Sequence, residues 1–375
     1  MKKPTLGNIA RACCCSGFLL LALQLQGAQL DTWASQTSGT TNDFYAVAYG
    51  NGTFVAVGTN GLLHSSTDGA IWTPRASGTT NDLESITYGS GLFVAVGGRG
   101  SVLTSTNGIT WTNQSSGFTS SFHAVTYWNS LYVAVGFGGA IRISTNATDW
   151  APVNSPAVSS LQSVIWANGR YVASGYVGTI LTSPDGTNWT SQVSGSAVAL
   201  HTIAYGAGTY VVAGYTGDLR TSPDGVTWTS QVSGTVNSLR GAIYTNGNFV
   251  VIGFHGTIIS STDGTNWVVR SSGVLDALRD VAYGSGAFVA VGHNGRILRT
   301  ASLVSPILAN SSFGGNMFHF SFASVNGMTY AIEYKNNLND SIWTLLNTTN
   351  GTGGVTPIND LTATVPKRFY RVGVQ

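Results

Sequence analysis

The chain has 375 residues, more than a single hydrophobic core usually supports, so two domains are expected. Charged residues make up only 9% of it and glycines number 48, a composition typical of many tight turns and few helices. The 17 basic and 15 acidic residues nearly cancel, which excludes a polybasic field for nucleic acid or anionic lipid.

Residues 1–28 have the order of a secretory signal peptide. Lys2, Lys3 and Arg11 precede an apolar run over residues 12–25, and small residues follow that run. The run is shorter than the ~20 residues of a membrane helix, although a retained anchor is the alternative interpretation. We therefore predict a secreted, periplasmic or cell-surface protein with no integral membrane segment after signal removal.

The three cysteines, Cys13, Cys14 and Cys15, precede the apolar core of that signal, whereas a lipid-modified cysteine would follow it. All three are expected to leave with the signal. A mature chain without cysteine excludes disulfides, a thiol nucleophile and cysteine-ligated metal sites.

The rest of the chain is dominated by a 39-residue repeat. One series of aromatic residues with this period is Trp33, Trp72, Trp111, Trp150, Trp189, Trp228 and Trp267. A second series is Tyr49, Tyr88, Tyr127, Trp166, Tyr205, Tyr244 and Tyr283.

Each repeat is expected to contain four short strands, in the first copy residues 45–49, 53–58, 62–66 and 71–76. Asn-Gly and Asp-Gly pairs separate them, and these are strong hairpin signals because both turn positions need positive φ. A repeat of about 40 residues with four strands is typical of a β-propeller blade. The prediction is an all-β fold with a seven-bladed β-propeller.

The ends of the repeat region predict how the ring closes. Residues 278–301 supply three strands, but Pro306 stands where the next tryptophan is due. The segment 31–39, with Trp33, is expected to add the outer strand of the last blade by pairing with residues 295–300. Closure of this kind leaves no long open edge, and it places the propeller at residues 29–302.

The third turn and fourth strand of most repeats carry the pattern Ser-x-Asp/Asn-Gly-x-x-Trp, as in residues 66–72. This pattern resembles the Asp-box (BNR) repeat of sialidases, sortilin-type receptors and photosystem II assembly-factor propellers, one residue short of the usual spacing. The resemblance implies a structural role in which the acidic or amide side chain holds its own hairpin and the tryptophan packs between blades. The residues concerned are Asp68 and Trp72, Asn107 and Trp111, Asp185 and Trp189, Asp224 and Trp228, and Asp263 and Trp267.

The third repeat departs from this pattern, with Asn146 and Ala147 in place of Asp-Gly. Its turn is therefore expected to be looser or of another type. Calcium binding is not expected at these turns, because one carboxylate cannot supply the six to eight oxygens that calcium prefers.

Residues 303–375 contain alternating segments at 318–322, 330–334, 342–346 and 368–372, which predict a small β-sandwich. The order Tyr-x-Ile-Glu, Trp-Thr-x-Leu, Phe-Tyr-Arg-Val resembles the immunoglobulin- or fibronectin-like modules that end many secreted bacterial proteins.

Ligand contacts are expected on the rim opposite the Asp-box turns, because loop variation there is free of the repeat's constraints. One variable position at the start of the first strand is occupied by Tyr45, Glu84, His123, Gln162, His201, Arg240 and Arg279. The following turn holds Phe137, Tyr176, Tyr215, Phe254 and His293. Aromatic faces beside polar groups suit sugars or peptides, although the same residues would also serve simply as channel lining and packing.

Catalysis is not supported by the motifs. Glu84, Arg240 and Arg279 come from separate repeats that are not expected to converge, and Glu84 is the only carboxylate expected on this rim, whereas glycoside cleavage needs two. No Gly-x-Ser-x-Gly elbow or helix-backed glycine loop is present. The histidines are scattered, with His255 and His293 as the only candidate metal pair.

The sequence thus favours a binding or scaffold protein with no catalytic residues, no cofactor and no metal, whose partner is a protein or glycan and not nucleic acid. A sialidase-like glycoside hydrolase is the alternative, and a purely architectural role is the third hypothesis.

Overall fold

The computed structural model describes residues 29–301, 309–314, 317–324, 329–337, 340, 342–351, 354–361 and 369–374. They belong to two compact units, one spanning Leu30–Thr300 and the other containing the C-terminal strands. The predicted signal peptide and its cysteines lie outside the described residues, so export stays a prediction. Among the residues described, no helix is long and apolar enough to cross a membrane.

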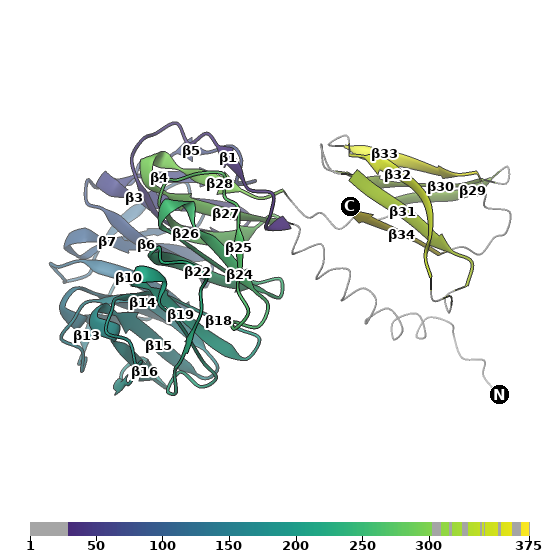
Figure 1. The fold of residues 1–375 in the computed structure, drawn as a ribbon. Coiled ribbons are helices and arrows are strands. Elements are labelled where there is room, and N and C mark those ends of the chain that lie inside the picture. The colour runs from purple at the N-terminus through teal and green to yellow at the C-terminus, as the bar shows by residue number, and fades with distance from the viewer. Residues whose placement is uncertain are drawn as a thin grey trace, which may run out of the picture. The chain divides into compact units, whose positions relative to one another are not determined.

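The first unit consists of seven four-stranded antiparallel sheets (Figure 1). Six of them are built from four consecutive strands, and the seventh combines strands from both ends of the unit. The first strands are β2 (Phe44–Gly50), β6 (Leu83–Gly89), β10 (Phe122–Trp128), β14 (Leu161–Ala167), β18 (Leu200–Gly206), β22 (Leu239–Thr245) and β26 (Leu278–Gly284). The second strands are β3 (Thr53–Gly58), β7 (Leu92–Gly97), β11 (Leu131–Gly136), β15 (Arg170–Gly175), β19 (Thr209–Gly214), β23 (Asn248–Gly253) and β27 (Ala287–Gly292).

The third and outer strands are shorter. The third strands are β4 (Leu63–Ser66), β8 (Ser101–Ser105), β12 (Ile141–Ser144), β16 (Ile180–Ser183), β20 (Leu219–Ser222), β24 (Ile258–Ser261) and β28 (Ile297–Arg299). The outer strands are β5 (Thr73–Pro74), β9 (Thr112–Ser115), β13 (Ala151–Val153), β17 (Thr190–Gln192), β21 (Thr229–Gln231), β25 (Val268–Arg270) and β1 (Ala34–Gln36).

A one-turn 3-10 segment joins the second strand of each sheet to the third. These segments are η1 (Thr59–Gly61), η2 (Gly98–Gly100), η3 (Phe137–Gly139), η4 (Tyr176–Gly178), η5 (Tyr215–Gly217), η6 (Phe254–Gly256) and η7 (His293–Gly295).

The sheets follow one another in a ring, because each first strand contacts the first strand of the next sheet and β26 contacts β2. The last sheet is completed from the other end of the unit. Ala34 pairs with Arg299 and Gln36 with Ile297, so β1 lies against β28 as the sequence predicts. This pairing covers the edge that β28 would otherwise expose.

The core lies between neighbouring sheets. Second strands are apolar on both faces, and in β3 the side chains of Val55, Ala56 and Val57 have no exposed surface. Ala56 and Trp72 of the first sheet form one cluster with Val289 of the last. Burial on both faces explains why these strands read as continuous apolar runs and not as alternating ones.

The turns before the outer strands are held by side-chain hydrogen bonds. Asp68 Oδ1 accepts the backbone N–H groups of Ala70 and Ile71 at 2.8 and 3.0 Å, and the indole N–H of Trp72 donates to the Gly69 carbonyl at 2.9 Å. The same contacts recur at Asp185, Asp224 and Asp263 with their tryptophans.

The second sheet differs in one bond. Asn107 Oδ1 accepts the backbone N–H groups of Ile109 and Thr110 at 2.9 and 3.0 Å, as the aspartates do. The indole N–H of Trp111, however, has no hydrogen-bond partner among the described residues.

The expectation of a different turn in the third repeat is wrong. Asn146 Oδ1 accepts the N–H groups of Thr148 and Asp149, both at 2.9 Å, and the indole of Trp150 donates to the Ala147 carbonyl. Ala147 adopts φ of 62°, the left-handed conformation that glycine has elsewhere. Hydrogen bonding and tryptophan packing thus impose the shared turn on a residue with a Cβ.

The C-terminal unit has two three-stranded sheets. Their strands are β29 (Ala309–Gly314), β30 (Met317–Ala323) and β33 (Val355–Asp360) in one sheet, and β31 (Thr329–Lys335), β32 (Thr344–Asn350) and β34 (Phe369–Val374) in the other. Phe320 and Phe322 of the first sheet share a buried cluster with Tyr330 and Ile332 of the second. The strands β29 and β33 are additions that the sequence pattern did not predict.

Candidate ligand-binding site

The seven variable residues at the start of the first strands surround one cavity of about 210 Å³, which we call the mouth cavity. Its lining consists of Tyr45, Asp82, Glu84, His123, Gln162, His201, Arg240 and Arg279. Seven sheets that follow one another in a ring bring equivalent positions together, although the residues lie 39 apart in sequence.

A β-bulge explains why this position points into the cavity. In the first sheet Phe44 pairs with Gly58 and Ala46 with Val57, so Tyr45 has no partner of its own. The same register shift occurs in all six other sheets. Because a bulged residue leaves the regular alternation of the strand, its side chain is re-aimed, and its identity is free of the constraints on sheet packing.

Two expectations about convergence are wrong. Glu84, Arg240 and Arg279 line the same cavity, because the ring brings the second, sixth and seventh sheets around it. Glu84 is also not the only carboxylate, since Asp82 lies in the same lining. The sequence offered a signal for Asp82, because it precedes a variable position by only two residues.

One side of the mouth cavity holds two arginines that form no ion pair with any described carboxylate. Arg240 lies over the Phe254 ring at 4.8 Å and Arg279 over the Tyr45 ring at 4.9 Å. The Nε atoms of both arginines are buried and have no hydrogen-bond partner in the part of the chain that the structure describes. Burial, and secondarily the charge of Arg279, lowers the pKa of Arg240 to about 10, so the Arg240 guanidinium stays cationic at neutral pH.

His201 adds a neutral donor beside the arginines. Burial and then the charges of Arg240 and Arg279 lower the pKa of His201 to about 3. A neutral ring that accepts from Arg240 Nη1 at Nδ1, 3.4 Å away, carries its proton on Nε2. That Nε2 and the amide Nε2 of Gln162 are also buried, and neither has a partner among the residues described. The cavity therefore presents N–H donors without a described acceptor.

The opposite part of the cavity is already paired. His123 Nδ1 lies 2.9 Å from Glu84 Oε2. Asp82 Oδ1 accepts the backbone N–H of Asn60 at 2.8 Å. The acidic side chains therefore have hydrogen-bond partners within the protein, whereas the two arginines have no carboxylate partner among the described residues.

The aromatic residues predicted at the following turn are not part of the cavity lining. His201 lies between the rings of Tyr176 and Tyr215, with centroids 6.1 and 6.2 Å away, and Phe254 lies 6.0 Å from His293. Phe137 is the most exposed of them at 62%.

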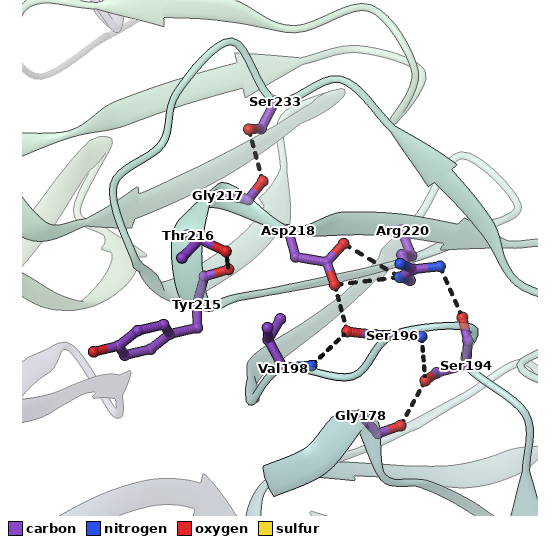
Figure 2. A network of polar contacts seen from close by, with 10 residues as sticks. All are labelled: Gly178, Ser194, Ser196, Val198, Tyr215, Thr216, Gly217, Asp218, Arg220 and Ser233. Atoms are coloured by element: carbon purple, nitrogen blue, oxygen red, sulfur yellow. Dashed lines mark hydrogen bonds and ion pairs between the residues drawn. The ribbon is translucent and has the colours of Figure 1, made fainter.

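Polar contacts fix the turn that presents Tyr215 (Figure 2). Ser233 Oγ donates to the Gly217 carbonyl at 2.7 Å, and the Asp218 carboxylate accepts from Ser196 and Arg220. Gly217 has φ of 73°, and a Cβ there would lie 2.0 Å from the Thr235 carbonyl oxygen, so only glycine fits. Ser196 Oγ also accepts the N–H of Val198, which secures the loop leading to His201.

Metal ligation has no support among the residues described, where no group of three or more His, Cys, Asp or Glu side chains could hold an ion. His293 Nε2 instead lies 4.0 Å from Asp43 Oδ2. Burial and the charge of Arg279 lower the pKa of His293.

Four-stranded antiparallel sheets arranged in a ring, with a polar cavity at one mouth, define a β-propeller. Among solved structures the chain is similar to YCF48 bound to D1 peptide, with a TM-score of 0.61, 18% identity, and coverage of 72% of this chain and 95% of that one. It is also similar to the WD40 β-propeller domain of Doa1 (TM-score 0.60, 11% identity, 73% and 97% covered). A third is a catalytically inactive virginiamycin B lyase from Staphylococcus aureus with quinupristin (TM-score 0.63, 9% identity, 72% and 99% covered).

These identities are low, so the similarity concerns the fold. No protein-family model matches the sequence, and none of the curated proteins matches it either.

Proposed function

We propose that the chain is an exported, non-catalytic, seven-bladed Asp-box β-propeller that binds a protein or glycan at the mouth cavity. The C-terminal unit is proposed to be an immunoglobulin- or fibronectin-like spacer or docking module. The observation that carries the proposal is the convergence of seven variable bulge residues on one cavity whose arginines lack carboxylate partners.

The N–H donors of the mouth cavity indicate which chemical group of a ligand would enter it. Each of Arg240, Arg279, Gln162 and His201 has one buried N–H nitrogen that lacks an acceptor among the described residues. Buried donors without acceptors are costly. An anionic oxygen group would satisfy them, with Arg240 and Arg279 supplying the charge. A cavity of about 210 Å³ is below the ~300 Å³ of ordinary small-ligand pockets, so it suits one acidic group of a larger ligand.

Arrays of peptides and glycans, each with acidic and neutral members, test this proposal. We expect binding to be enriched among acidic members and to weaken by about 2 kcal/mol or more in Arg279→Gln, because a buried charge contact is lost. Arg99→Gln, at the exposed centre of η2, is the matched control and should bind normally. Binding without acidic preference, or equal loss in both variants, would contradict the proposal.

Glycoside hydrolysis is the second candidate, because Asp82 and Glu84 place two carboxylates in one cavity. Hydrolysis and binding predict different results in an assay of glycoside turnover. Turnover of fluorogenic glycosides that disappears in Glu84→Gln would establish an enzyme, and no turnover across the panel favours the binding role.

A further inference from the structure

A second unusual site lies at the other end of the first strands, at the junction of β10 and β14. The last residue of the first strand is small in the other six sheets, namely Gly50, Gly89, Ala167, Gly206, Thr245 and Gly284, but it is Trp128 in β10. The neighbouring first strand β14 carries Trp166 where every other sheet has tyrosine. Both departures from the repeat thus occur at one junction.

The packing of the propeller does not require this pair. At four of the other junctions bare glycine backbone lies against the next tyrosine ring, so that a Cβ on Gly50 would come within 2.1 Å of Tyr88. At the remaining two junctions the small residue is Ala167 or Thr245. Trp128 instead lies over Trp166, with ring centroids 5.9 Å apart and ring planes inclined by 13°. Half of Trp128 stays exposed, and exposing an indole of this size carries a hydrophobic cost.

This pair borders a separate cavity of about 610 Å³, which we call the tryptophan cavity. Asn168, Tyr205 and Tyr244 also line it, together with Ile165 and Ile243. The side-chain amide of Asn168 donates to the carbonyl of Pro223 at 3.4 Å. Pro223 stands in the turn of Asp224, so the tryptophan cavity lies on the rim of the Asp-box turns, away from the mouth cavity.

Among the described residues that line the tryptophan cavity, none has an ionised side chain, in contrast to the mouth cavity. A nucleic acid or an acidic polymer would need cations there. Parallel indole faces beside an amide and tyrosines instead match a pyranose ring, which presents C–H groups on its faces and neutral hydroxyls at its edge. The volume falls within the ~300–1,000 Å³ range of ligand sites.

We propose that the tryptophan cavity binds a neutral, hexose- or pentose-based oligosaccharide, which stacks on the face of Trp128. This site is independent of the mouth cavity and of whatever binds there. Trp166 supports the platform from below, and Asn168 and the tyrosines supply hydrogen bonds to sugar hydroxyls.

Calorimetric titration of the full chain with cellohexaose, xylohexaose and maltohexaose tests the proposal. We expect at least one of them to bind, and binding to be at least about tenfold weaker in the double variant Trp128→Gly/Trp166→Tyr. That variant restores the residue types of the other junctions, so it should fold. Phe137→Ala, which removes an exposed aromatic side chain at the opposite rim, should bind like the wild type.

Three results would overturn the proposal. The first is that none of the three oligosaccharides binds, and the second is that the double variant binds as tightly as the wild type. The third is that the wild-type chain sediments as a dimer and the double variant as a monomer, which would make the tryptophan pair a contact between two copies of the chain. Loss of acidic-ligand binding in Arg279→Gln would not affect any of these readouts.

Discussion

At the scale of single residues, the turns before the outer strands depend on a few hydrogen-bonding atoms that recur from repeat to repeat. Asp185 Oδ1 accepts two backbone N–H groups, from Thr187 and Asn188, each at 2.8 Å. These bonds, chiefly that of Asn188, hold the pKa of the Asp185 carboxyl well below its usual range, and Asp263 behaves in the same way. The carboxylate form is thus favoured in the folded state.

Asp185→Asn tests this contribution through its pH dependence. A depressed pKa contributes stability that is present above the unfolded pKa of about 4 and is lost as pH falls below it. We expect the variant to be less stable than wild type at pH 7 and the difference to shrink toward pH 2. Urea denaturation at both pH values measures it.

Asn107→Asp provides the reciprocal change, because Asn107 already has the geometry without the charge. It should gain stability at pH 7 and lose the gain in acid. A constant difference at all pH values would assign the effect to packing instead.

Single strands and turns depend on how backbone conformation and side-chain packing combine. Gly108 in the turn after β8 has φ of 70°, and a Cβ there would lie 2.7 Å from Val55. Ala147 holds the equivalent place after β12 with φ of 62° and is buried with Val94 and Tyr132. The same turn is therefore built with and without glycine.

Gly108→Ala should destabilise the protein by about 1 kcal/mol or more, since left-handed strain and a steric contact add together. Ala147→Gly should change stability by less than about 0.5 kcal/mol, because relief of strain is offset by backbone entropy and a lost buried methyl. Thermal denaturation of the two variants checks this asymmetry. A large gain from Ala147→Gly would show that the turn of the third sheet is strained.

The whole propeller depends on joining its two ends. Leu30 is buried and Trp33 packs against the same cluster as Phe288 and Leu298. The pairing of β1 with β28 completes the only sheet built from both ends of the unit. Removing the first segment would therefore expose both a strand edge and part of the core.

A chain that starts at residue 39 should unfold at a lower temperature than a chain that starts at residue 29. It should also self-associate, because the free edge of β28 offers unpaired N–H and C=O groups. Calorimetry and sedimentation compare the two chains. Equal midpoints and equal mass would show that β1 adds nothing to closure.

The sequence by itself determined the period, the strands and the closing strand, because these follow from local turn chemistry and from alternation repeated every 39 residues. It also identified the variable position, since a repeat makes any deviation visible. Of the tryptophan pair, Trp166 stands in the second aromatic series, where it departs from tyrosine, whereas Trp128 lies outside both series.

The tertiary structure alone decided what those deviations do. It showed that repeats two, six and seven meet at one cavity, because a ring brings together residues that sequence distance separates. It showed that the arginines lack carboxylate partners while Glu84 has His123, which depends on three-dimensional distances. It also retained the shared turn at Asn146 and Ala147, because packing and hydrogen bonds outweigh the local preference for glycine.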